Sequence, residues 1–395
     1  QGVTMGTNNL FSGQLQNVLN STTFESNAPL IAPHAGKKPE VFLDLNGIQN
    51  IDFVNENHFT KGSYGIKAVD CRFNLSDATF TEVDFGIESK VMSPTVTTGH
   101  EFHNNRFYKY FTAIRIDNGL NDKIGTNLFN PATHNGTQEQ NYIGISLQAC
   151  NGFLLTDNIF YKNKYGIMVH KSGLLNNRIS TNTGTGNQFI SCWRGIHTTG
   201  TNPSLQIKCN YFQNNQASTQ YSAAWYVHDL LCNQGSNNQS DPQSPAGNRF
   251  YHAPASRVDL VSKQGSGPNG LNFIYYHHSP NGHPEVKPTV NNANWIQLVN
   301  KNIAYDQLTA CTGITLMVLA DNSPDTAKLI IDNTTDSILA RQYANELVQW
   351  YIIHNMDSAA IDYLNTNNLG LDERLLFSLY AEHGAYTETT DLLAQ

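Results

Sequence analysis

Apolar and polar residues alternate in short runs along most of the chain, and the runs end at Asn or Gly. This alternation has the period of a strand rather than of a helix. The stretch NIFYKNKYGIMV, residues 158–169, shows it well: an Asn, an aromatic residue two places later, a polar run, and then Tyr-Gly-Ile with an alternating tail. Because Asn and Gly tolerate left-handed backbone angles, the pattern predicts short strands separated by turns.

The stretch is one copy of a repeat. Asn-x-Phe occurs with its Asn at positions 57, 105, 127, 158, 187, 210 and 248, and Gly-Ile occurs with its Gly at positions 65, 86, 144, 166 and 195. Phe precedes Ile by seven residues at 59/66, 107/114, 160/167 and 189/196; the pair 80/87 keeps this spacing but lacks the Asn, and Ala113 replaces Gly in one copy. Between Phe129 and Ile145 the polar insertion NPATHNGTQEQN breaks the spacing.

Successive Ile residues lie 21, 27, 31, 22 and 29 residues apart. Strands repeated at this interval, none of which closes a core alone, predict a solenoid whose coils stack their apolar positions. We therefore expect Phe160 and Ile167 to point inward, Asn158 to lie at a bend in a hydrogen-bonded ladder, and Met168 to face outward.

The pattern N-x-F-x(5)-G-I resembles the coils of right-handed parallel β-helix, pectin-lyase-like repeat proteins. The resemblance implies a mainly β fold, with a parallel β-helix solenoid over residues 1–300 and its clearest coils at 50–275. It implies little about activity, because this scaffold carries lyases, hydrolases, adhesins and passive stalks.

The pattern changes after about residue 330. Apolar residues follow a helical spacing at positions 338, 339, 343, 347, 350 and 353, which predicts a small α-helical, hairpin-like region over 333–395. Residues 301–332 would connect or close the solenoid. A β-helix followed by short helices also resembles the β-helix segments of large secreted surface proteins of Bacteroidota.

Composition favours an extracellular or cell-surface chain. Charged residues make up only 14% of the chain, and the net charge is −8, which argues against a nucleic-acid partner. No apolar run reaches the roughly 20 residues of a membrane span. The chain starts at Gln1, which is typical of a mature or truncated product.

The six cysteines are widely spaced and include no C-x-x-C pair. An extracellular chain could pair some of them, and Cys209 with Cys232 would close the shortest loop. The alternative is that they are buried thiols that act as small apolar residues.

Stacked coils place residues of successive repeats in columns. If each Ile points inward, the next residue points outward, so one outward column holds Lys67, Glu88, Arg115, Ser146, Met168 and His197, and a second holds Val69, Lys90, Asp117, Gln148, His170 and Thr199. Glu88, Arg115 and Asp117 are the catalytic candidates, and Lys67, Gln148, His170 and His197 are candidates for ligand binding. The competing interpretation is an ordinary solvated sheet face.

Metal and cofactor chemistry have weak support in the sequence. His277, His278, His283 and Glu285 are the densest group of potential metal ligands, but SPNG forces a turn between them, so surface histidines beside packing tyrosines are the favoured interpretation. No cofactor is expected.

The leading hypothesis is a non-enzymatic structural or adhesive segment, a rigid spacer or surface whose partners are extracellular polysaccharide or other copies of itself. The alternative is a polysaccharide lyase or glycoside hydrolase that acts on an extended glycan along the β-helix face. The signatures of polygalacturonase-like enzymes are missing, and the chain has no Asp-Asp pair.

Overall fold

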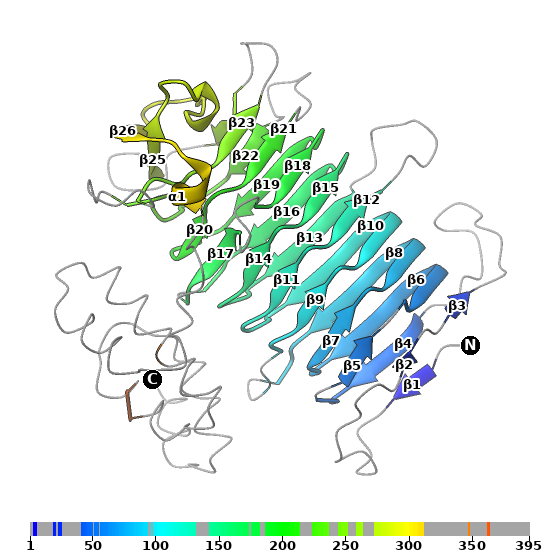
Figure 1. Cartoon of the computed structure of the whole chain (residues 1–395). Coiled ribbons are helices and arrows are strands. Elements are labelled where there is room, and N and C mark those ends of the chain that lie inside the picture. Colours follow the sequence, from blue (N-terminus) through cyan, green and yellow to red (C-terminus); the bar gives the residue numbers. More distant parts are fainter. Residues whose placement is uncertain are drawn as a thin grey trace.

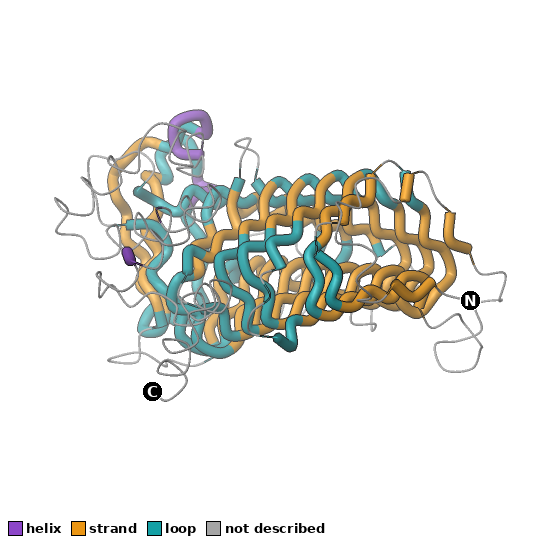
Figure 2. Tube along the Cα trace, turned by 90° about the horizontal axis from the view of Figure 1, so that it is seen from below, coloured by secondary structure: helices purple, strands orange, loops and turns teal. Residues whose placement is uncertain are grey.

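The computed structural model describes residues 3–5, 19–20, 23–25, 41–49, 51–54, 56–93, 96, 98–131, 142–173, 175–181, 186–213, 223–236, 244–251, 258–263, 272–311, 347 and 362–363. These residues form an elongated, right-handed parallel β-helix whose coils follow one another along a single axis (Figures 1 and 2). The predicted fold class is confirmed for this part of the chain. None of the helices among the described residues is long and apolar enough to cross a membrane.

Each coil contributes strands to three faces. The face that carries Asn-x-Phe, here the Phe face, consists of β3 (Thr23–Glu25), the first halves of β6 (His58–Val69), β8 (Thr79–Lys90) and β10 (Arg106–Asp117), and then β12 (Leu128–Asn130), β15 (Ile159–Tyr161), β18 (Gln188–Ile190), β21 (Tyr211–Gln213) and β23 (Arg249–Tyr251). The Gly-Ile face consists of β1 (Val3–Met5), β4 (Val41–Asn46), the second halves of β6, β8 and β10, and then β13 (Ile143–Gln148), β16 (Tyr165–His170), β19 (Arg194–Thr199), β22 (Ala223–Val227) and β24 (Leu260–Ser262). The third face consists of β2 (Leu19–Asn20), β5 (Ile51–Val54), β7 (Phe73–Ser76), β9 (Glu101–His103), β11 (Lys123–Gly125), β14 (Leu154–Thr156), β17 (Asn177–Ser180) and β20 (Leu205–Ile207).

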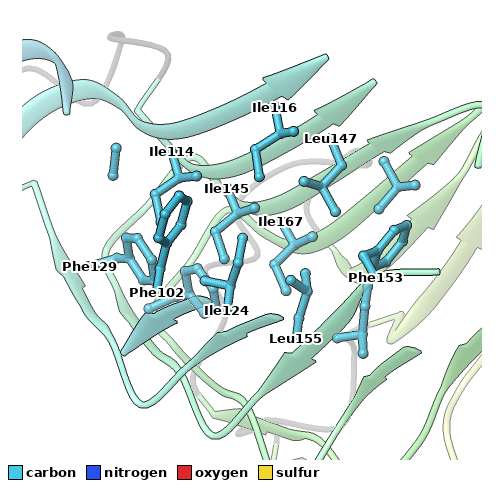
Figure 3. Close-up of a cluster of buried hydrophobic side chains, with 14 of the residues drawn as sticks. Phe102, Ile114, Ile116, Ile124, Phe129, Ile145, Leu147, Phe153, Leu155 and Ile167 are labelled. Atoms are coloured by element: carbon cyan, nitrogen blue, oxygen red, sulfur yellow. The ribbon is translucent and has the colours of Figure 1, made fainter. Parts of the chain in front are cut away.

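The repeat pattern sets the register of the coils. Phe160 pairs with Phe129 and Phe189 on the neighbouring coils, and Ile167 pairs with Ile145 and Ile196. Both Phe160 and Ile167 are fully buried, as expected. Figure 3 shows the isoleucines of three successive coils, Ile114, Ile145 and Ile167, in one row inside the solenoid. Burial of this continuous apolar column is the main force that holds the coils together.

The phenylalanines form a single stack from Phe59 to Phe250. Neighbouring rings lie 4.6–5.2 Å apart between centroids, with planes within 9° of parallel; the members are Phe59, Phe80, Phe107, Phe129, Phe160, Phe189, Phe212 and Phe250. A ring stacked on each side buries its whole surface, which one isolated coil could not achieve.

The spacing of this stack varies with the residue at the Gly position of the repeat. A Cβ added at Gly65, Gly86, Gly144, Gly166 or Gly195 would lie 2.6–2.7 Å from the next coil's carbonyl oxygen and 2.6–2.9 Å from the nearest atom of its Phe ring. The rings above these five glycines are 4.6–4.9 Å apart. Where Ala113 and Ala224 take the glycine's place, the rings are 5.1 and 5.2 Å apart. The extra methyl group thus coincides with a wider step.

A buried asparagine ladder runs beside the Phe stack, as predicted. Each Nδ2 donates to the Oδ1 of the next coil's Asn at 2.8–3.1 Å, along Asn105, Asn127, Asn158, Asn187, Asn210 and Asn248. Each Oδ1 also accepts a hydrogen bond from the preceding Asn's backbone N–H at 2.9–3.3 Å. Ala78, in the coil that lacks the Asn, occupies the corresponding position, and its N–H donates to Asn105 Oδ1 at 2.9 Å.

The last coil is covered by a parallel pair, β25 (Phe273–Ser279) and β26 (Ile296–Ala304), together with the short helices η3 (Pro284–Val286) and α1 (Gln307–Cys311). Tyr275 places its ring edge against Phe250 and accepts a hydrogen bond at its Oη from Asn248 Nδ2 at 3.1 Å. β26 crosses the expected boundary at residue 300. Of the predicted helical region 333–395, only Leu347, Asp362 and Tyr363 are described, each with helical backbone, so that region and the domain boundaries stay predictions.

One disulfide joins this closing segment to the solenoid. Cys209, which follows β20, is bonded to Cys311 in α1, across 102 residues of sequence. Cys209 is thus paired with Cys311 and not with Cys232, the partner that would close the shortest loop, because the fold brings the far more distant Cys311 to Cys209. Cys71, Cys150 and Cys192 are buried thiols, as the alternative expected, and Cys232 is half-buried.

Candidate functional site

The Gly-Ile face carries the two outward columns in the expected register. Lys67, Glu88, Arg115, Ser146, Met168 and His197 are successive partners, and the column continues to Tyr226 and Val261. Val69, Lys90, Asp117, Gln148, His170 and Thr199 form the second column. Met168 is half-buried beside the fully buried Ile167, which fits its expected outward direction.

The three catalytic candidates come together in one ion cluster on β8 and β10. Arg115 donates from Nη2 and Nε to the two carboxylate oxygens of Asp117 at 2.9 and 3.2 Å, and its Nη1 lies 3.6 Å from Glu88 Oε1. The hydrogen bonds to Asp117 raise the pKa of Arg115. The Arg115 guanidinium thus contacts both carboxylates, so each of them is paired with the same cation. Asp117 is only 8% exposed. The catalytic role of the three residues stays a prediction.

The candidate ligand residues do not share one place. Lys67 Nζ lies 5.6 Å from the Tyr64 ring, whereas Gln148 is exposed between Asp117 and His170 in the second column. His170 Nδ1 shares a 2.8 Å hydrogen bond with Thr199 Oγ1 of the next coil. Lys67 therefore lies beside Glu88 of the ion cluster, whereas His170 lies two coils beyond Asp117.

His197 lies among aromatic rings near the end of the solenoid. Its imidazole stacks on Tyr165 at 5.4 Å and meets the edge of Tyr226 at 5.2 Å. Burial, together with the charge of Arg194, lowers the pKa of His197 to about 3. The imidazole is therefore neutral at physiological pH and supplies a ring surface rather than a charge.

A row of half-buried aromatic side chains, here the aromatic track, precedes the Ile positions by two or three residues. Its members, one in each of six successive coils, are Tyr64, Phe85, Phe111, Tyr142, Tyr165 and Trp193. The track contains three pairs of rings in contact: Tyr64 with Phe85 at 4.9 Å, Phe111 with Tyr142 at 6.3 Å, and Tyr165 with Trp193 at 5.7 Å. Sequence reasoning missed the track, although an aromatic residue recurs at this offset from Ile in every one of these coils.

Cations accompany the last two rings of the track. Arg194 lies with its guanidinium carbon 4.3 Å from the Trp193 ring centroid and 3.8 Å from that of Tyr226. Lys164 Nζ lies 5.4 Å from Trp193 and 5.9 Å from Tyr165. These contacts fix the rings in place through cation–π attraction.

The metal-ligand candidates do not form one group. His277 Nδ1 is hydrogen-bonded at 2.7 Å to the carbonyl oxygen of His278, and both imidazoles are buried. The side chains of His283 and Glu285 are in contact, at 3.1 Å, and the His278 and His283 rings each meet Tyr305 edge-on. Within the described ranges, no three His, Cys, Asp or Glu side chains are placed to hold a metal ion.

Comparison with known proteins gives one match. Residues 8–248 match the family model described as "Periplasmic copper-binding protein (NosD)". No curated protein and no solved structure matches the chain. The matched residues contain the strands from β2 to β22, and they make up more than half of the 395-residue chain. On this match, and with the right-handed parallel β-helix that the structure shows, the chain belongs to the NosD family.

Proposed function

We propose that the chain is a non-enzymatic structural segment of an exported protein, in which the β-helix acts as a rigid spacer and binding surface. The observation that carries this proposal is the continuous interior, where a Phe stack from Phe59 to Phe250 runs beside an Asn ladder from Asn105 to Asn248. An interior filled in this way makes a stiff rod, because every coil is held by both of its neighbours.

An exported location is supported by two observations. The family is described as periplasmic, and disulfides such as Cys209–Cys311 persist in oxidising compartments outside the cytoplasm. We propose the periplasm or the cell surface as the site of action.

Copper binding, which the family's description names, is not part of this proposal. A copper site needs converging imidazole or sulfur ligands. In the described coils the buried thiols donate to backbone carbonyls instead: Cys150 to Ile116 at 3.2 Å and Cys192 to Phe160 at 3.5 Å. With no three-residue ligand group among the described residues, these residues do not fit a copper site.

The second candidate function is polysaccharide cleavage, which is favoured by the cluster of Glu88, Arg115 and Asp117. Both functions are tested by incubating the full chain with a panel of acidic and neutral polysaccharides and measuring reducing ends and unsaturated products. The structural proposal expects no release. Release that Asp117→Asn abolishes would overturn it in favour of an enzyme.

A further inference from the structure

The chain contains six Asn-Gly pairs, and four of them lie within the described residues, with the Asn at positions 46, 118, 151 and 281. An Asn before Gly loses its side-chain amide readily, because Gly has no Cβ to shield its backbone nitrogen from the Asn carbonyl carbon. The reaction needs room for the side chain and a Gly N–H that is not held in a hydrogen bond. The fold therefore decides which of the pairs can react.

Two of the pairs are tied to the neighbouring coil by hydrogen bonds. Gly47 N donates to Val69 O at 2.9 Å, so the nitrogen that would attack Asn46 is already engaged. Asn118 Nδ2 donates to Val91 O at 3.0 Å, which holds the amide that would have to leave. Both pairs can react only after a local opening of the coil.

A third pair is enclosed within the solenoid. Asn151 is only 1% exposed, and its Oδ1 accepts a hydrogen bond from Leu175 N at 2.8 Å. The side chain therefore cannot turn toward the nitrogen of Gly152 without breaking a buried contact. This pair, too, is protected by the fold.

The fourth pair lies in an exposed turn between β25 and η3. His283 N donates to Pro280 O at 3.0 Å and closes the turn, with Asn281 and Gly282 at its exposed tip. Among the described residues, neither the Gly282 N–H nor the Asn281 side-chain amide has a hydrogen-bond partner. A Cβ added at Gly282 would meet no heavy atom within 4 Å, so the space around the reacting groups is open.

We propose that Asn281 is a site of spontaneous deamidation, which the fold prevents at the other three described pairs. The Gly282 nitrogen gives up its proton and forms a bond to Asn281 Cγ, ammonia leaves, and a succinimide ring remains. Water then opens the ring at one of its two carbonyl groups, which gives aspartate or isoaspartate without any oxidation or reduction. Either product adds a negative charge to the segment that covers the last coil. Isoaspartate also inserts one methylene group into the backbone between β25 and η3.

The test is peptide mapping by mass spectrometry after prolonged incubation of the full chain at mildly alkaline pH. Replacement of the amide by a carboxyl group raises the mass of a peptide by about 1 Da. Incubation in water enriched in heavy oxygen marks the products that form before digestion. The three protected pairs are internal controls, and a parallel incubation in guanidinium chloride removes the protection.

In the folded chain we expect Asn281 to convert at least about tenfold faster than Asn46, Asn118 and Asn151, because those three react only from locally opened states. In guanidinium chloride the four rates should converge. Equal rates in the folded chain would overturn the proposal. So would a preference for Asn281 that persists unchanged in the unfolded chain, because the local sequence rather than the fold would then cause it.

Discussion

Replacing Asn158 by Ala should open a local defect in the middle of the ladder. The amide oxygen of Asn158 accepts hydrogen bonds from Asn127 N and Asn127 Nδ2, both at 3.0 Å, and its Nδ2 donates to Ile124 O at 2.8 Å and to Asn187 Oδ1 at 2.9 Å. Two of the four partners keep a second bond: Asn127 Nδ2 to Phe102 O at 2.9 Å, and Asn187 Oδ1 from the backbone N–H of residue 158 at 3.1 Å.

The cost can be worked out from the partners that remain. Asn127 N loses the acceptor it has in Asn158 Oδ1. Ile124 O lies in β11 between two paired strands, and the equivalent carbonyl oxygen of Ile179 accepts both a backbone and an Asn hydrogen bond, so Ile124 O keeps a backbone donor. One buried unsatisfied group costs about 1–3 kcal/mol, and the free energy of unfolding should fall by about that amount. Urea unfolding followed by tryptophan fluorescence measures the total, and hydrogen–deuterium exchange of the peptide that contains Asn127 measures the local effect.

The chain supplies a matched control in Ala78, which occupies the ladder position of the coil without Asn. Ala78→Asn adds an amide where Asn105 Oδ1 already accepts a hydrogen bond from the backbone, so it should change the unfolding free energy by less than about 1 kcal/mol. If Asn158→Ala also cost less than about 1 kcal/mol, and the Asn127 amide stayed protected from exchange, the ladder would not carry the stability assigned to it.

Three further predictions concern the core, a buried carboxyl and the disulfide. Gly166→Ala should lower the free energy of unfolding, measured in urea, by about 1–3 kcal/mol, because the added Cβ meets a carbonyl oxygen at 2.6 Å. The control Ala113→Gly should lower it by no more than about 1 kcal/mol. Equal effects of the two substitutions would contradict the role of glycine in ring spacing. Burial raises the pKa of Asp122 to about 7 from an ordinary 3.8, so the folded state keeps a proton that the unfolded state releases. The stabilisation is therefore fully present below pH 4 and is lost as the pH rises to 7. Asp122→Asn should flatten this part of a profile of melting temperature against pH, and an unchanged slope would refute the assignment. Cys311→Ser should lower stability by about 4–5 kcal/mol, as expected for a closed loop of 102 residues, and a reductant should lower the wild-type midpoint but not the variant's.

The interior was predictable from the sequence because its chemistry repeats. Phe160, Ile167 and Asn158 recur at fixed offsets, and parallel stacking leaves only one register in which like residues meet. The same reasoning placed Glu88, Arg115 and Asp117 near one another, since they belong to adjacent coils of two neighbouring columns.

Other features could not be read in this way. The partner of Cys209 depends on how the chain folds back after the last coil, which no repeat encodes. The aromatic track was missed because an aromatic side chain beside Gly-Ile looks like core in the sequence. In the structure a left-handed residue five places before Ile, such as Lys162 before Ile167, interrupts the strand alternation. His277 and His278 were expected to be surface histidines beside packing tyrosines, which was wrong, because both lie in strand β25 and are buried.

The asparagine ladder also has a direction. Every Nδ2 from Asn105 to Asn210 donates toward the C-terminal end, and the last donor, Asn248, ends on the hydroxyl of Tyr275. Turning over one amide would set donor against donor on one side and acceptor against acceptor on the other, so all six must share one orientation. The solenoid thus contains an aligned row of amide dipoles, whose acceptor end meets the backbone N–H of Ala78 and whose donor end meets the hydroxyl of Tyr275. This polarity gives the two ends of an otherwise uniform rod different chemistry.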